Sequence, residues 1–206
     1  LIERAKKENN FEKVIALAID GEKQDDYYSG RKPKWKEFGY EANKKLSLKA
    51  EQARLAKELL FDGQFEYYQE LKDLNNGDEK EFYDELKSKL KEDTRWQAKN
   101  IYINLIEQED DTDEIMAYVR ENPHYIVRYA ELLKDNYADE VDELYSNHIR
   151  SAAHSSSKRS AYQDVCGLIR RYKNIVGKDN TAELVNELLV LYKKKRAFVY
   201  ELSKLD

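Results

Sequence analysis

Apolar residues recur along most of this chain at spacings of three and four, with charged residues between them. Positions three and four apart lie on one face of an α-helix, so each run predicts a helix with a single apolar stripe. The clearest stripes are Phe82, Leu86 and Leu90; Ala98, Ile101, Tyr102 and Leu105; Tyr125, Ile126, Tyr129, Leu132 and Leu133; Tyr162, Val165, Ile169, Tyr172 and Val176; and Leu184, Val185, Leu188, Leu189 and Tyr192. Only residues 101–106, IYINLI, alternate as a strand would, and their helical neighbours favour helix there.

Helix-start signals divide these stripes from one another. A side chain that accepts backbone N–H groups begins a helix, and a glutamate or glutamine three positions later, or a proline at the first position, strengthens the signal. We expect helices to begin after Asp78, Thr94, Asp111, Asn122 and Asn180. The links are short, so each helix has to bury its stripe against its sequence neighbours, as an antiparallel hairpin.

An internal repeat supports an array of such hairpins. Residues 58–63, ELLFDG, are followed by Glu70-Leu71, and residues 131–136, ELLKDN, are followed by Glu143-Leu144 at the same offset. The separation of the two copies equals about two units of a hairpin repeat of 34 to 37 residues. Small residues and a turn glycine around the first copy resemble the tetratricopeptide pattern. We therefore predict an all-α fold, an array of antiparallel helical hairpins forming a tetratricopeptide-like α-solenoid.

One connection interrupts the expected array. Residues 20–34 are charged, contain two glycines and are long for a link between helices, so they predict a mobile loop or a domain boundary. We expect residues 1–34 to form loosely attached N-terminal helices and a loop, and residues 35–206 to form the array.

The composition agrees with helix throughout and limits the compartment. The chain has only 7 glycines and 2 prolines, the residues that most often interrupt helices. A single cysteine, Cys166, excludes an internal disulfide and suits a reducing compartment. There is neither an apolar run long enough to span a membrane nor a signal-peptide pattern at the N-terminus, so we expect a cytoplasmic protein without a membrane partner. Because the chain begins at Leu1, we expect it to be part of a longer protein.

The sequence lacks the residue patterns of metal, nucleotide or catalytic sites. His148, His154 and Cys166 do not have the spacing of zinc ligands. Asp111-Thr112-Asp113 begins like a calcium loop, but Ile115 stands at the third ligand position. Gly177-Lys178 is followed by Asp179, so the serine or threonine of a phosphate-binding loop is missing. We expect no metal, no cofactor and no enzymatic activity, and we expect Cys166 to be a core residue.

Charge is distributed unevenly along the chain. Residues 1–148 carry 24 basic and 35 acidic groups, whereas residues 149–206 carry 12 basic and 6 acidic groups. A solvated surface explains such a bias; so does a docking face for an acidic protein or a nucleic acid. The candidate partner-binding residues are Arg159, Arg170, Arg171, Lys173, Lys193, Lys194, Lys195 and Arg196. The acidic remainder repels a polyanion, so we expect a protein partner, with weak nucleic-acid binding as the alternative.

A family resemblance covers the last third of the chain. The segments ADEVDELYSNHIRSAA and AYQDVCGLIRRYKNIVGKDNTAELVNELLVLYKKKRAFVYELSKL, within residues 137–205, resemble the C-terminal helical region of bacterial SWIM zinc-finger proteins. That family similarly shows a basic helix ending in glycine, an Ala-Glu-Leu helix and a tyrosine-basic turn into a final Glu-Leu helix. Its zinc-binding Cys-x-Cys and Cys-x-His pairs are absent from this sequence. The resemblance implies a fragment downstream of a zinc finger that binds protein or nucleic acid, in some cases alongside helicase-like ATPases.

Overall fold

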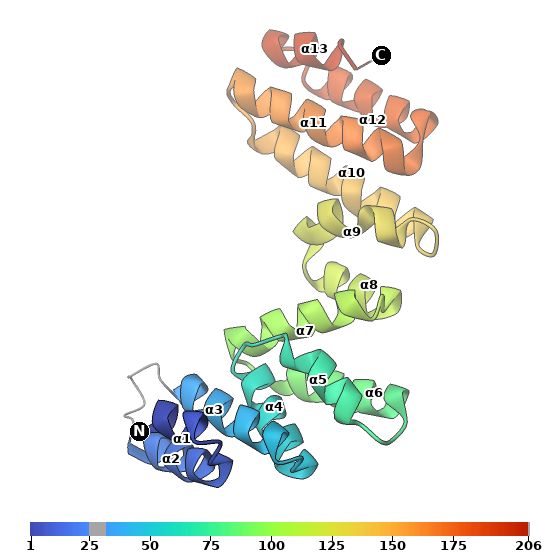
Figure 1. Cartoon of the computed structure of the whole chain (residues 1–206). Helices are drawn as coiled ribbons and strands as arrows, with labels where there is room; N and C mark the ends of the chain where they lie inside the picture. Colours follow the sequence, from blue (N-terminus) through green and yellow to red (C-terminus); the bar gives the residue numbers. More distant parts are fainter. Residues whose placement is uncertain (25–31, 206) are drawn as a thin grey trace. The chain divides into compact units, whose positions relative to one another are not determined.

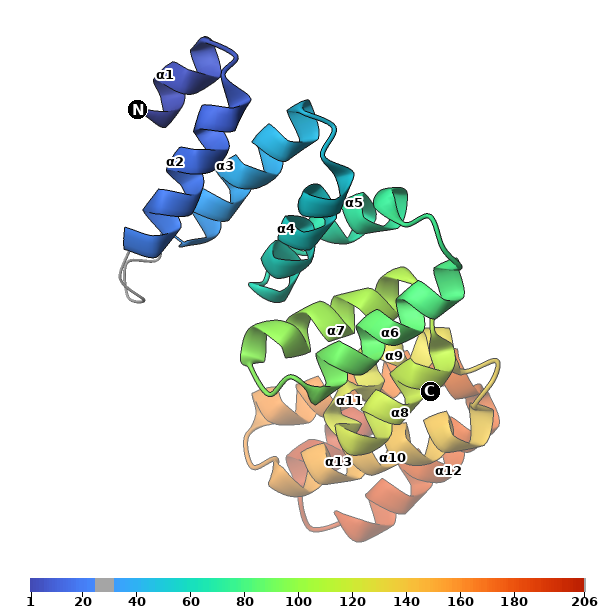
Figure 2. The same cartoon turned by 90° about the horizontal axis from the view of Figure 1, so that it is seen from below.

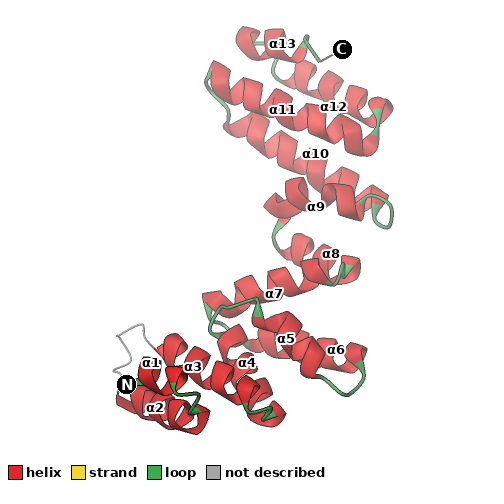
Figure 3. Cartoon of the chain, viewed as in Figure 1, coloured by secondary structure: helices red, strands yellow, loops and turns green. Residues whose placement is uncertain are grey.

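The computed structural model describes residues 1–24 and 32–205, and every regular element in these two ranges is a helix (Figure 1; Figure 3). The all-α prediction is therefore confirmed. It holds even for residues 101–106, which lie within a helix and bury Ile101, Leu105 and Ile106. The chain divides into two compact units, Leu1–Asp110 and Asp111–Asp206.

Unit 1 consists of seven helices within its described residues. They are α1 (Ile2–Lys7), α2 (Phe11–Gln24), α3 (Lys32–Lys45), α4 (Lys49–Phe61), α5 (Tyr67–Leu74), α6 (Glu79–Glu92) and α7 (Trp96–Gln108). Helices α1 to α5 pack consecutively, each against the next, and α6 packs against α7 (Figure 2). Such contacts between sequence neighbours are those of the predicted hairpin array.

The first two helices of unit 1 share a buried cluster with α3. Ile2 and Ala5 of α1, Val14 and Ala18 of α2, and Ala42 of α3 form one buried cluster. Burial of a continuous apolar cluster stabilises the contact between these helices. We expected residues 1–34 to be loosely attached, whereas α1 packs on α2 and α2 packs on α3.

The connection after α2 is shorter than the sequence predicted. Residues 20–24 continue α2 and residue 32 begins α3, so the helices extend into the expected loop from both sides; the remaining residues, 25–31, lie outside the described ranges. Gly21 was a reason to expect a loop. Its backbone instead lies against the Trp35 indole, where a Cβ would come within 2.6 Å of ring carbons. Glycine therefore permits α2 to approach α3 closely without ending the helix.

Unit 2 contains six α-helices and one 3₁₀ turn in the part of it that is described. They are α8 (Thr112–Glu121), η1 (Pro123–Tyr125), α9 (Ile126–Leu133), α10 (Ala138–Ser155), α11 (Arg159–Val176), α12 (Lys178–Leu191) and α13 (Arg196–Leu202). Each helix packs on its successor, and in addition α10 contacts α12 and α11 contacts both α9 and α13. Alternate helices thus lie next to one another, and we call α10 and α12 the even row and α9, α11 and α13 the odd row.

Two of the predicted helix starts are confirmed, at residues whose side chains cap the helix that follows. Asp78 accepts the Glu81 backbone N–H at 2.8 Å, and Asp111 accepts that of Glu114 at 3.1 Å. Thr94 does not cap its helix: α7 begins after Arg95, and the Asp93 side chain accepts the Arg95 backbone N–H. Asn180 lies inside the first turn of α12, where its amide donates to Asp142 of α10 instead. These two predictions were wrong: the helices begin after Arg95 and Gly177 instead.

Both copies of the internal repeat fall on a helix, a turn and a second helix. The first spans the end of α4 and most of α5, and the second spans the end of α9 and the first half of α10. Gly63 adopts a φ of 109° in the first turn, a left-handed conformation that glycine tolerates best. No helix in the described ranges has the length and apolar character needed to cross a lipid bilayer.

Candidate interaction surfaces

The eight basic residues proposed from the sequence form two groups along α11. The first, which we call the α11-start group, comprises Arg159, Lys193, Lys194, Lys195 and Arg196. The link after α12 lies beside the start of α11, because Lys195 donates to the backbone carbonyl of Ser156 at 2.9 Å. The second, the α11-end group, comprises Arg170, Arg171 and Lys173. It begins about 16 Å further along the helix, at 1.5 Å per residue. The eight residues are therefore not one cluster.

Two members of the α11-start group are engaged within the fold. The Arg159 Nε donates to Glu201 at 2.9 Å, which links the first turn of α11 to α13. The Lys195 ammonium, besides its bond to Ser156, lies 4.7 Å from the centroid of the Tyr192 ring. Bonds of this kind hold the C-terminal helices together, so neither residue is freely available to a partner.

The α11-end group contains the residues with most freedom to bind a partner. Arg170 and Arg171 are exposed, and neither has a hydrogen bond, ion pair or aromatic contact with any described residue. Arg196 shares this property, whereas every other arginine in residues 1–24 and 32–205 bonds a carboxylate or lies over an aromatic ring. Lys173 is half-buried, with its ammonium 3.5 Å from the Leu205 carbonyl oxygen. Arg170 and Arg171 thus form an exposed and unbonded pair of guanidinium groups in unit 2.

The two rows of unit 2 differ in charge. The even row carries seven acidic and two basic side chains, whereas the odd row carries three acidic and six basic ones. The excess of basic residues after residue 148 therefore belongs to α11 and to the links, because α12 itself is acidic. This difference in charge between the rows is hard to see in the sequence, because helices of the two rows alternate along the chain.

An acidic groove, which the sequence did not predict, lies along the even row. It has a volume of about 480 Å³ and is lined by Asp139, Asp142, Glu143, Ser146, Arg150, Tyr172, Asn180, Glu183, Leu184 and Glu187. Arg150 donates to Glu187 at 2.9 Å, and this bond lowers the pKa of the Glu187 carboxyl. The Tyr172 hydroxyl donates to Asp142; burial raises the pKa of this hydroxyl, and the bond to Asp142 raises it further. The groove thus includes two pairs of side chains that already bond each other, Arg150–Glu187 and Tyr172–Asp142.

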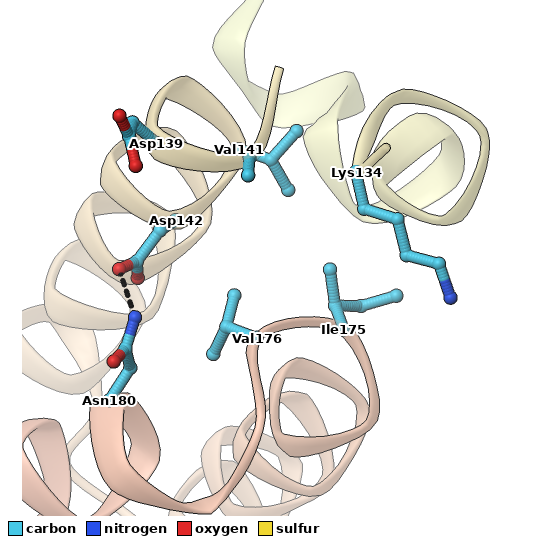
Figure 4. Close-up of a pocket in the computed structure, with 8 residues that line it drawn as sticks. Lys134, Asp139, Val141, Asp142, Ile175, Val176 and Asn180 are labelled. Atoms are coloured by element: carbon cyan, nitrogen blue, oxygen red, sulfur yellow. Dashed lines mark hydrogen bonds between the residues drawn. The ribbon is translucent and has the colours of Figure 1, made fainter. Parts of the chain in front are cut away.

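A smaller cavity lies next to this groove (Figure 4). Its volume is about 170 Å³, and Val141, Ile175 and Val176 supply its apolar walls. Asn180 donates to Asp142 at 2.6 Å along one edge, while the Lys134 ammonium turns away from the cavity toward Glu131, which it bonds. The Asn180 amide and the Lys134 ammonium are therefore both engaged by other side chains.

Unit 1 has an apolar groove of its own, over α3 and between α2 and α4. Its volume is about 310 Å³. It is lined by Ile15, Ala18, Ile19 and Glu22 of α2, by Trp35, Lys36, Gly39 and Asn43 of α3, and by Leu48, Glu51, Arg54 and Leu55 at α4. No local sequence pattern predicts this groove, because its lining residues come from three different helices.

The cysteine and the side chains that could bind a metal have the following surroundings. Cys166 is 2% exposed, which confirms that it is a core residue, and burial raises the pKa of its thiol. Among the residues that the structure describes, no three His, Cys, Asp or Glu side chains converge as metal ligands would.

Comparison with known proteins adds no relative. No protein-family model, no curated protein and no solved structure matches the chain.

Proposed function

We propose that the chain is a non-catalytic helical-repeat module that binds an acidic surface of another protein through Arg170 and Arg171. One observation supports the proposal: these adjacent guanidinium groups are exposed and unbonded, whereas the other arginines that the structure describes, Arg196 excepted, are engaged within the fold. A guanidinium group offers several N–H donors in a planar fork, which suits a carboxylate. An arginine that is not already bonded can bind such a partner without breaking an internal ion pair.

An acidic protein fits this surface better than a nucleic acid does. Residues 1–148 have an excess of eleven acidic groups, and the even row of unit 2 is acidic as well. A long polyanion meets repulsion wherever it runs beyond the odd row, whereas a protein partner can contact the α11-end group alone. Nucleic-acid binding through the C-terminal helices is the second candidate, and it is favoured only by the six basic residues of the odd row.

The test compares two charge-reversal variants that change the net charge by the same amount. Arg170→Glu/Arg171→Glu alters the proposed surface, and Lys45→Glu/Lys49→Glu alters two exposed lysines of unit 1 that have no ion pair in the described structure. Poly-glutamate serves as an acidic polypeptide probe, and duplex and single-stranded DNA serve as nucleic-acid probes. Binding is measured by titration near physiological salt.

We expect the wild-type chain and the unit 1 variant to bind poly-glutamate, and the Arg170→Glu/Arg171→Glu variant to lose at least roughly tenfold in affinity. Equal binding by both variants would remove the proposed surface. DNA binding that is tighter than poly-glutamate binding, and that the arginine reversal abolishes with a steep salt dependence, would favour the nucleic-acid candidate instead.

We propose a cytoplasmic location, from the single cysteine. We also propose, from the residues quoted above, that the chain lies downstream of a zinc finger in a bacterial SWIM-type protein. The product of the complete gene tests the second of these directly, since the Cys-x-Cys and Cys-x-His pairs would have to be present upstream.

A further inference from the structure

One side of α11 forms a surface together with α13. Its residues are spaced alternately by four and three positions and therefore share one face of the helix: Arg159, Gln163, Cys166, Arg170 and Lys173. Two contacts place this face beside α13. Arg159 bonds Glu201 at one end, and the Lys173 ammonium lies 3.5 Å from the Leu205 carbonyl oxygen at the other. The face extends about 21 Å from Arg159 to Lys173, at 1.5 Å per residue.

Arg170 belongs to this face and lies near the charged groups at the end of α13. The pKa of the Cys166 thiol is raised chiefly by burial, and the charges of Arg170, Glu201 and Lys204 act on it as well. All three charged groups therefore lie close to Cys166. We call the surface made by Arg159, Arg170, Lys173, Tyr200, Glu201 and Lys204 the α11–α13 face.

Arg171 points to a different side of α11, although it follows Arg170 directly. Its charge acts on Tyr145 of α10, whose hydroxyl pKa burial raises and Arg171 partly lowers. Asp164, the one acidic residue of α11, precedes Arg171 by seven positions and so shares its side of the helix. Two adjacent arginines that are equally exposed and unbonded thus have different surroundings.

One buried carboxylate holds Arg159 and Lys204 in position. Glu201 is 5% exposed, and its two oxygens accept from the Arg159 Nε and from the Lys204 ammonium, each at 2.9 Å. The Tyr200 ring centroid lies 5.9 Å from the Arg159 guanidinium and 4.1 Å from the Lys204 ammonium. The bond to Glu201 uses only Nε, so the other two guanidinium nitrogens of Arg159 can bond a partner without breaking it. Cations that are already fixed lose little conformational freedom on binding.

The α11–α13 face carries more positive charge than its own acidic group neutralises. Arg159, Arg170, Lys173 and Lys204 are four cations, and Glu201 is one carboxylate, which leaves an excess of three positive charges. These charges are spread along the length of α11 and are not gathered at one point. A complementary partner therefore has negative charges repeated over about 21 Å.

We infer that the α11–α13 face binds an acidic linear segment of another protein, in an extended form alongside α11. The inference rests on the proposed function, in which Arg170 binds an acidic protein, and it specifies the form of that partner. A chain of like charges repels itself and extends. At about 3.1 Å per residue, roughly seven residues of such a chain span the face. Their carboxylates bond Arg170, Lys204 and the two remaining nitrogens of Arg159.

The same face is less suited to single-stranded nucleic acid. Proteins that bind single strands combine cations with aromatic rings on which the bases stack. Tyr200 is 57% exposed, but Arg159 and Lys204 already lie over its ring. A base would compete with these two cations for the ring, whereas a carboxylate binds them where they are.

The test uses peptides of three, seven and eleven consecutive glutamates, each flanked by glycine and serine to the same total length. Arg170→Gln and Arg171→Gln form a matched pair, since each removes one exposed charge and no bond within the described structure. Arg159→Gln/Lys204→Gln removes the two fixed cations, and Lys45→Gln/Lys49→Gln in unit 1 is its control. Binding to the full chain is measured by fluorescence anisotropy near physiological salt, and circular dichroism checks that each variant is folded.

We expect affinity to rise at least roughly tenfold from three to seven glutamates and less than about fivefold from seven to eleven, because the longer peptide gains only alternative registers. Arg170→Gln should weaken binding of the seven-glutamate peptide at least roughly threefold, and Arg171→Gln less than about twofold. Arg159→Gln/Lys204→Gln should weaken it at least roughly fivefold, whereas the unit 1 control binds as the wild type does.

The outcomes separate this inference from the proposed function. Equal losses in Arg170→Gln and Arg171→Gln, with no loss in a folded Arg159→Gln/Lys204→Gln variant, would overturn the α11–α13 face and leave acidic-partner binding through the two arginines intact. Absence of binding to every glutamate peptide would overturn both. Tighter binding of oligothymidylate than of the seven-glutamate peptide, lost in Arg159→Gln/Lys204→Gln, would replace the acidic segment by a nucleic acid.

Discussion

The rings of Tyr145 and Tyr172 lie 5.5 Å apart in the core of unit 2, but their hydroxyl groups have opposite surroundings. The Tyr172 hydroxyl donates to the Asp142 carboxylate, whereas the Tyr145 hydroxyl is buried without a hydrogen-bond partner in residues 1–24 and 32–205. Both side chains are 1% exposed. Removing the hydroxyl group from one ring should therefore affect stability differently from removing it from the other.

We expect Tyr172→Phe to lower the free energy of unfolding by about 1.5–3 kcal/mol, because it removes a hydrogen bond to a charged group. Tyr145→Phe should leave the free energy of unfolding unchanged or raise it by up to about 1 kcal/mol, since a buried hydroxyl without a partner is unfavourable. Urea unfolding followed by circular dichroism measures both variants. A loss of stability in Tyr145→Phe as large as that in Tyr172→Phe would contradict the interpretation.

The lysines after α12 should differ in their contribution to stability. Lys195 bonds the Ser156 carbonyl and lies over the Tyr192 ring, whereas Lys194 is exposed and unbonded in the described structure. We expect Lys195→Met to lower the free energy of unfolding by about 1–2 kcal/mol, which in a chain of this size is a fall of about 2–8 °C in melting temperature. Lys194→Met is the control and should change the melting temperature very little. Equal melting temperatures for the two variants would show that the Lys195 contacts contribute nothing.

Alkaline pH should destabilise the fold through its buried tyrosines. Burial raises the pKa of Tyr67 from 10.0 to about 12, and burial also raises the pKa values of Tyr40, Tyr145 and Tyr172. A folded state with the higher pKa retains the proton that the unfolded state loses. This stabilisation is complete below pH 10 and is lost as the pH rises toward about 12.

The measurement is the urea midpoint as a function of pH, together with the ultraviolet absorbance of tyrosinate. We expect the midpoint to fall from pH 10 upward, with some tyrosines ionising only on unfolding. Tyr67→Phe should make the decline shallower. A urea midpoint that stays constant from pH 10 upward would show that the buried tyrosines do not contribute to the pH dependence of stability.

Acid should weaken a link between α5 and the end of α7. The Glu109 carboxylate accepts hydrogen bonds from the Tyr68 hydroxyl and the Lys72 ammonium, both at 2.8 Å. Burial tends to raise the pKa of Glu109, but the bonds from Lys72 and Tyr68 outweigh it and hold the pKa below its ordinary value of 4.5. The folded state therefore favours the ionised form. Its stabilisation is present above pH 4.5 and is lost as the pH falls through the lowered pKa.

We expect Glu109→Gln to lower the free energy of unfolding at neutral pH by about 1 kcal/mol and to reduce the dependence of stability on pH below 4.5. Glu41→Gln, at an exposed glutamate of α3 without an ion pair in the part of the chain described, is the control. If both variants had the same acid profile as the wild type, Glu109 would have no part in acid unfolding.

Features that depend on near neighbours in the sequence were predictable. The three-and-four spacing of apolar residues identified helices such as α11 and α12, and Asp78 and Asp111 cap the helices that follow them. Gly21 misled the prediction because glycine also serves close packing: it lies against Trp35 inside α2. A single sequence does not distinguish these two uses of glycine.

The interaction surfaces were only partly predictable for the same reason. Charge composition identified the basic C-terminal region, but the partners that engage Arg159 and Lys195 lie about forty residues away, at Glu201 and Ser156. Asn43 lines a groove that exists only after α2, α3 and α4 have packed. Contacts between distant segments decide which charges stay free, and a one-dimensional pattern does not contain them.

Because the even and odd rows of unit 2 carry opposite net charge, the unit has an electric dipole that points across its helices. A dipole experiences a torque in the field of a charged body before any atoms touch, within a distance of about 8 Å at physiological ionic strength. Near an anionic surface this torque turns α11 toward that surface and α12 away from it. The arrangement of charge therefore selects the orientation of the encounter, and added salt should slow productive association more than it speeds release.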